Sequence, residues 1–172
     1  MNRSEKLSVE LYNSVFGDPW HGTGLKDILE KISFKQTDKR SISSAHNIIE
    51  LTLHLDAWTE ETLKRFIGGQ PSLPTMRDWP IFKDKSEEYW QAVKQKLFAD
   101  TNKLIAVIKK FSEKKLDKIV GEERNAPLGT GFSFEGLIIG LVQHNAYRAG
   151  QIALLKKRFD TVTLLVNKRL FI

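Results

Sequence analysis

The sequence contains no cysteine, which excludes disulfide bonds, thiolate metal ligands and a cysteine nucleophile and is compatible with a reducing compartment. It also has no apolar run of the roughly 18 residues that a membrane-spanning helix needs. Its charged N-terminal stretch, residues 1–17, lacks the continuous apolar segment of a signal peptide. Together these absences predict a soluble cytoplasmic protein with no membrane partner.

Basic residues outnumber acidic ones, 27 to 21, so the formal net charge is +6. Such an excess is compatible with binding to nucleic acid or to other anions. The basic residues gather near the expected ends of helices, where cations complement the helix dipole, and aromatic residues do not alternate with them as stacking platforms would. We therefore expect no nucleic-acid partner. The two clusters are Lys109, Lys110, Lys114 and Lys115, and Lys156, Lys157 and Arg158.

Signals for β-strands are few, whereas four long segments carry helical apolar periodicity. With 41% hydrophobic residues, the 172-residue chain can bury one sizeable core. The pattern predicts a single all-α domain over residues 1–172, a four-helix bundle with an extended tail at 159–172. Residues 68–84 hold three prolines and two glycines, which predicts a long loop able to join parallel neighbours. The expected helices span about 4–16, 43–67, 86–111 and 133–158.

Two of the four histidines interrupt apolar helix faces. His54 lies between Leu51, Leu55 and Trp58 at helical spacing, and His144 lies in the middle of the last helix. A buried imidazole needs a hydrogen-bond partner or a metal, and imidazole is a common ligand of zinc, nickel and iron. The residues alone leave a hydrogen-bonded core and a metal site as about equal alternatives.

The last helix, HNAYRAGQIALLKKR, resembles the signature of the DinB/YfiT-like family, in which this helix commonly reads H-x-x-x-H-x-G-Q-I. The segments PWHGTGLKDILEKI, SSAHNIIELTLHLDAWTEETLKRFIGG and DWP are similar to other parts of that family, so the resemblance covers nearly the whole chain. It implies a four-helix bundle of up-down-down-up topology with a long crossover loop between helices 2 and 3. It also implies homodimers, and a divalent metal such as Zn, Ni, Fe or Mn held by three histidines.

Carried over by position, the resemblance assigns two ligands to His54 and His144 and the third to Arg148, where this sequence departs from the pattern. Arginine stays protonated and has no lone pair to offer a cation. Three alternatives follow. In the first, the metal is lost and Arg148 pairs with Glu50, with Asp56 or with an anionic ligand. In the second, His54 and His144 bind a metal with help from a carboxylate, water or substrate.

In the third and least favoured alternative, His46 replaces the missing ligand. If the helix begins near residue 43, His46 lies two turns before His54, about 12 Å along the axis. The other candidate site residues have secondary roles. Glu50 is a surface ion-pair partner, a counter-ion of Arg148 or a substitute ligand, Gln151 could hydrogen-bond into the cavity, and Tyr147 and Trp58 either belong to the core or line the cavity. His21 is expected in an exposed loop.

Two classes of function compete, together with a third possibility, a dimeric scaffold without metal. The resemblance implies a metal-dependent hydrolase or a transferase that uses a small thiol, in which the metal lowers the pKa of bound water or thiol. Arg148 instead favours a non-catalytic bundle in which its guanidinium recognises a small carboxylate or phosphate. The sequence names no substrate.

Overall fold

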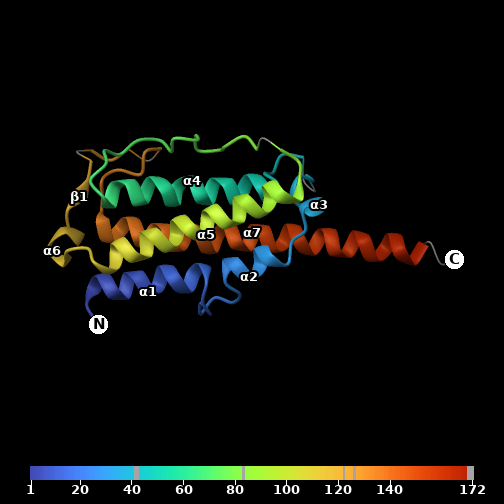
Figure 1. Ribbon diagram of the computed structural model, residues 1–172, viewed down its shortest axis with the longest axis horizontal. Helices are drawn as coiled ribbons and strands as arrows, with labels where there is room; N and C mark the ends of the chain where they lie inside the picture. Colours follow the sequence, from blue (N-terminus) through green and yellow to red (C-terminus); the bar gives the residue numbers. More distant parts are fainter. Residues whose placement is uncertain (41–42, 83, 122, 126, 170–172) are drawn as a thin grey trace.

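The protein is mostly helical in the computed structural model, which describes residues 1–40, 43–82, 84–121, 123–125 and 127–169 (Figure 1). For residues 160–169 it describes the backbone alone. The all-α fold class is therefore confirmed, with one small antiparallel two-stranded sheet added to it. In chain order the elements are α1 (Arg3–Val15), α2 (Leu25–Glu30), α3 (Phe34–Thr37), α4 (Ile48–Phe66), α5 (Glu87–Lys109), α6 (Glu113–Leu116), β1 (Ile119–Val120), β2 (Phe132–Ser133) and α7 (Phe134–Arg169).

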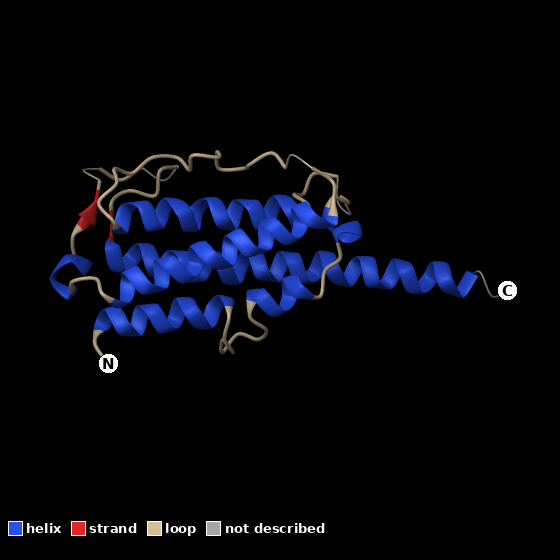
Figure 2. Ribbon diagram, in the orientation of Figure 1, coloured by secondary structure: helices blue, strands red, loops and turns tan. Residues whose placement is uncertain are grey.

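Four long helices form the body of the molecule. Helix α4 packs against α5 and α7, and α1 packs against the same two helices. The sequence colours in Figure 1 show that α1 and α7 run in one direction while α4 and α5 run in the other. The segment between α4 and α5, residues 67–86, passes along the length of the bundle (Figure 2). This long connection brings loop residues alongside the middle of α4.

Helix α4 begins at Ile48, several residues later than the sequence predicts. Asn47 has an extended backbone, and its side chain accepts a hydrogen bond from the Glu50 amide. The Glu50 carboxylate in turn accepts from the Asn47 amide, so the two residues form a capping box. The predicted start near residue 43 is wrong because this reciprocal pair fixes the helix terminus. His46 consequently lies before α4 and not within it.

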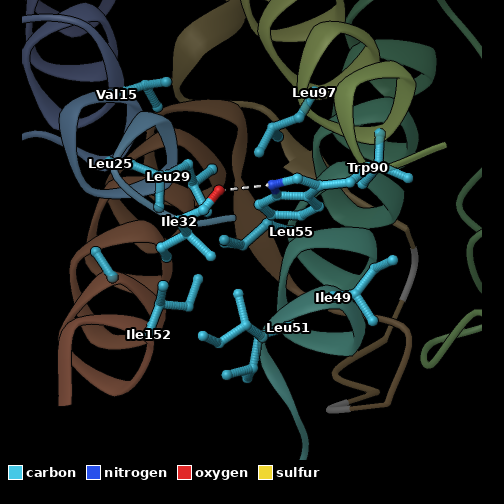
Figure 3. Packing of buried hydrophobic residues seen from close by; sticks show 13 residues of the cluster. Val15, Leu25, Leu29, Ile32, Ile49, Leu51, Leu55, Trp90, Leu97 and Ile152 are labelled. Carbon is cyan, nitrogen blue, oxygen red and sulfur yellow. Dashed lines mark hydrogen bonds between the residues drawn. The ribbon is translucent and has the colours of Figure 1, made fainter. Parts of the chain in front are cut away.

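The core around the site joins α1, α2, α4, α5 and α7. Its largest fully buried side chain is Trp90, whose indole Nε1 donates to the Ile32 carbonyl oxygen at 3.0 Å. Figure 3 shows that bond with Leu25, Leu29 and Leu55 around it. A buried indole N–H needs such an acceptor. The bond therefore ties the loop after α2 to α5.

The C-terminal region differs from the sequence prediction. Helix α7 continues through Arg169, so the expected extended tail at 159–172 is wrong for 159–169, and residues 170–172 lie outside the described part. The alternation of Val162, Leu164 and Val166 is short. A helix that is already formed gains one hydrogen bond for each further residue. Across the described residues, no helix is both long enough and apolar enough to cross a membrane.

Candidate functional site

The two histidines singled out by the sequence meet between α4 and α7. The Nε2 atoms of His54 and His144 lie 2.9 Å apart, and the ring planes are inclined at 72°. His54 is 3% exposed and His144 is partly buried. The apolar faces that place α4 against α7 thus bring the two imidazoles together edge to face.

The loop residue Asp78 fixes the tautomer of His54. The Asp78 carbonyl oxygen lies 2.6 Å from His54 Nδ1. A carbonyl oxygen only accepts, so Nδ1 carries the proton and neutral His54 keeps its lone pair on Nε2. The Asp78 carboxylate accepts from Trp58 Nε1 at 2.7 Å, which holds this part of the loop on α4. Hydrogen bonds of this kind, made by the ring nitrogen that does not bind the metal, orient imidazoles in metal sites.

Trp79 lies between the rings of two histidines. Its ring is parallel to both His46 and His54, inclined at 5° to each, with centroid distances of 3.5 and 4.0 Å. Two coplanar imidazoles at those distances would overlap on one face of the indole, so they occupy opposite faces. His46 therefore lies closer to the site than the sequence predicts, because it precedes α4, but the Trp79 ring separates it from His54.

Arg148 directs its guanidinium at both imidazoles. Its Nε donates to His144 Nε2 and its Nη2 donates to His54 Nε2, each at 3.3 Å. Its Nη1 donates to Gln151 Oε1 at 3.0 Å. The guanidinium carbon also lies 5.1 Å from the ring centroids of both Trp79 and Tyr147, within the range of cation–π attraction. These contacts place the positive charge at the point where the two Nε2 atoms converge.

The expected pairing of Arg148 with Glu50 or Asp56 is wrong. Glu50 is bound by Arg40 and by His46 Nδ1, and Asp56 is bound by Lys96. Each carboxylate is therefore already paired with a cation other than Arg148. Among the residues that the structure describes, Arg148 forms no ion pair with a carboxylate.

Burial makes both imidazoles poor bases. It lowers the pKa of His144 to about 4, and the charges of His54 and Arg148 act in the same direction. Burial also lowers the pKa of His54 below 6.5, although the bond to Asp78 offsets part of the effect. Both rings are therefore neutral near pH 7. The neutral His144 carries its proton either on Nε2, where it bridges to His54, or on Nδ1, where it leaves Nε2 free to accept from Arg148.

This set of donors does not fit the three-histidine metal centre that the sequence resemblance implies. Two imidazole nitrogens converge as ligands would, and the tautomer of His54 suits ligation. The third group is a guanidinium whose N–H bonds point at the lone pairs that a metal would need. Its charge also opposes a cation at that point. A metal could approach both Nε2 atoms only after Arg148 has moved away.

A different group of potential metal ligands lies between α4 and α5. Carboxylate oxygens of Asp56, Glu60 and Asp100 lie within 4.8 Å of one another, a cluster that the sequence did not reveal. The Lys96 ammonium contacts one oxygen of each, at 2.8, 2.9 and 2.7 Å. The ammonium thus fills the place that a cation would take, and a metal would have to displace it.

Two cavities flank the cluster of His54, His144 and Arg148. One of about 260 Å³ is lined by Arg148, Gln151 and His46 together with apolar side chains. The other, of about 540 Å³, has His144 and Trp58 in its wall. Both volumes suit small molecules or parts of them.

The structure brings together most of the predicted site residues. His54, His144, Arg148 and Gln151 are in contact, Trp58 joins them through Asp78, and Tyr147 reaches Arg148 although it is 63% exposed. Glu50 reaches this network only through His46 and Trp79 among the described residues, and His21 is exposed. Sequence reasoning missed Asp78 and Trp79 as site residues. Their only signal was the DWP motif in the long loop.

Comparison with known proteins gives one family. Searches of curated proteins and of solved structures find no match. The family model described as the DinB superfamily matches residues 21–152, which include α4, the long loop and the His144–Arg148 part of α7. The match covers well over half of the chain and every residue of the cluster described above. The chain therefore belongs to the DinB superfamily.

Proposed function

We propose that this chain is an up-down-down-up four-helix bundle that binds a small carboxylate or phosphate through Arg148, without a metal at its two histidines. One observation carries the proposal. The Arg148 guanidinium lies 3.3 Å from the Nε2 atoms of both His54 and His144 and has no carboxylate partner among the described residues. A partly buried cation without a counter-ion favours an anionic ligand.

The charges and donors around Arg148 support this assignment. Both imidazoles are neutral, because burial lowers the pKa of each. Asp78 contacts His54 at Nδ1, the edge of the ring away from the guanidinium. A guanidinium has five N–H donors, and among the described residues His54, His144 and Gln151 contact at most three of them. The cavity of about 260 Å³ beside Arg148 gives a ligand access to these donors.

The test is calorimetric titration of the untagged protein with acetate, with inorganic phosphate and with neutral acetamide. Binding of acetate or phosphate, at least 10-fold weaker in Arg148→Gln, is the expected result. Arg158→Gln removes the same charge from an exposed position of the same helix and should leave the affinity unchanged. Equal affinity for acetamide, or equal loss in both variants, would contradict the proposal.

A metal-dependent hydrolase or thiol-dependent transferase is the second candidate function. The observation that favours it is the convergence of the two Nε2 atoms, with His54 held in the tautomer suited to ligation. It requires the Arg148 guanidinium to leave both nitrogens. Metal analysis of untagged protein decides between the two functions. Stoichiometric Zn, Ni, Fe or Mn that is lost in His54→Ala would support the enzyme, and metal-free protein would support the anion site.

A further inference from the structure

The larger cavity, of about 540 Å³, has a different lining from the cavity of about 260 Å³ beside Arg148. Its lining residues come from α4, from α7, from the turn before β2 and from β2 itself. Apolar side chains from these elements predominate, and His144 provides its link to the histidine cluster. The lining comprises Trp58, Thr62, Arg65, Gly129, Phe132, Gly136, Leu137, Ile139, Gly140, Leu141, Gln143 and His144.

Three polar side chains of this wall, Trp58, Thr62 and Arg65, are already engaged elsewhere, whereas Gln143 is exposed. Arg65, its one charged side chain, pairs with Glu61 at 3.1 Å and donates to the carbonyl oxygens of Leu128 and Gly129 at 2.6 and 3.1 Å. Trp58 Nε1 donates to Asp78, and Thr62 Oγ1 donates to the Trp58 carbonyl oxygen. A charged ligand would find no free counter-ion among the described residues of this wall, whereas an apolar ligand would meet a mostly apolar surface.

On the α7 side Gly140 leaves room, whereas Gly136 packs against Ser133 and Phe132. Gly136 and Gly140 are four residues apart and therefore share a helix face. A Cβ atom built on Gly140 would meet no atom within 4 Å, so its missing side chain opens onto free space. Ile139 and Phe132 in the same lining are 46% and 41% exposed. Glycine weakens a helix interior, and at Gly140 no tight packing explains its presence.

We propose that this cavity binds an uncharged small molecule with an aromatic or alkyl body, whose single hydrogen-bonding group lies beside His144. The volume falls within the range of small-molecule sites. The charged side chain of the described wall, Arg65, is already paired with Glu61, which disfavours a charged ligand. His144 is the residue that the cavity shares with the cluster, so the ligand lies next to the histidines. The inference goes beyond anion binding and does not depend on it.

The test uses N-phenyl-1-naphthylamine, a neutral dye whose fluorescence rises in apolar surroundings. Titration of the full chain should give a saturable rise in fluorescence. The affinity for the dye should be at least 10-fold lower in Gly140→Leu, because the new side chain fills the cavity. Gly150→Leu is the matched control. Gly150 lies in the same helix, is exposed and also has no atom near a built Cβ. Both variants should melt at a higher temperature, which shows that any loss of binding is local.

Competition then tests the ligand class. Octanol should displace the dye at concentrations at least 10-fold lower than octylammonium or octanoate. No enhancement in the unmodified chain, equal binding by Gly140→Leu, or better displacement by either charged compound would overturn the proposal. Arg148→Gln separates the two sites, because it should weaken acetate binding at least 10-fold while it changes dye affinity less than 3-fold. Acetate binding without dye binding would refute this inference alone. Dye binding without acetate binding would refute the anion site alone.

Discussion

At the scale of single residues, Arg148 determines which chemistry the cluster can perform. It lies four residues after His144 and therefore on the same face of α7. Its guanidinium reaches the two Nε2 atoms that a metal would need. A histidine at this position would exchange a fixed positive charge for a third neutral nitrogen. One side chain thus separates a site suited to anions from one suited to cations.

Replacing Arg148 with histidine should create a metal site. With His54 and His144 already convergent, a third imidazole completes a ligand set of the kind that catalytic zinc sites use. We expect Arg148→His to bind Zn²⁺ or Ni²⁺ at least 100-fold more tightly than the unmodified chain in competition with a chelator. Arg148→Gln, which removes the charge without supplying a ligand, is the control. Equal affinities in the two variants would show that the histidines are not placed for ligation.

The Arg148 charge should also be visible in the titration of His144. Burial is the main reason that the pKa of His144 is lowered to about 4, and His54 and Arg148 lower it further. In Arg148→Gln we expect this pKa to rise but to stay below 6.5, because burial remains. Two-dimensional NMR of the imidazole ¹⁵N resonances between pH 3 and 8 measures both values and the tautomers. An unchanged pKa would mean that the guanidinium does not face this ring.

The sequence predicts some of these residues for a clear physical reason. His54 and His144 interrupt apolar helix faces, and two such faces in one bundle meet in its interior. The sequence could not show whether Arg148 has a carboxylate partner, because helical spacing alone does not exclude a contact with either Glu50 or Asp56. The structure gives each of them a nearer cation. Asp78 and Trp79 lie in a loop without periodicity, so no pattern places them against His54.

At the scale of elements, α4 is held from two sides by different kinds of interaction. Toward α7 it presents His54 to the histidine cluster, and toward α5 it presents Asp56 and Glu60 to Lys96. The extent of α4 was largely predictable from its apolar stripe. Its start was not, because the capping pair of Asn47 and Glu50 outweighed the preceding serines. That shift of a few residues moves His46 out of the helix and onto Trp79.

The contact between α4 and α5 should make stability depend on pH. Burial raises the pKa of Asp56 to about 6 from 3.8, although Lys96 opposes the effect, and the buried Asp56 Oδ1 has no hydrogen-bond partner among the described residues. Because the folded state favours protonated Asp56, its contribution is fully present below pH 3.8 and is lost as the pH rises through about 6. The difference corresponds to about 3 kcal/mol.

Urea denaturation of the unmodified chain and of Asp56→Asn at several pH values measures this effect. The free energy of unfolding of the unmodified chain, relative to that of the variant, should fall by up to about 3 kcal/mol between pH 4 and pH 7. Glu60→Gln controls for the loss of a negative charge next to Lys96, because the Glu60 side chain is 43% exposed. A difference between the unmodified chain and Asp56→Asn that is independent of pH would refute the assignment.

At the scale of the whole molecule, α7 is longer than the other helices of the bundle. Its 36 residues correspond to about 54 Å, against about 35 Å for the 23 residues of α5. Figure 1 shows its C-terminal part running past the other helices. An isolated helical segment is marginal in water without a packing partner. The helical backbone of this segment, together with its apolar sequence LLV at 164–166, therefore favours a contact with another chain.

We predict that the contacting chain is a second copy of this one. Light scattering coupled to size exclusion should give twice the chain mass of 19.7 kDa, 39.4 kDa. A variant that ends at residue 159 should elute at the mass of a single chain while its circular dichroism keeps the helical signal of the bundle. Among the side chains that the structure describes, the core includes Leu155 and Phe159 near this end of α7, so a truncation that keeps Phe159 retains those packing contacts. A single-chain mass for the full sequence at micromolar concentration would show that no such contact forms. A dimer that persists after truncation would place the contact elsewhere in the chain.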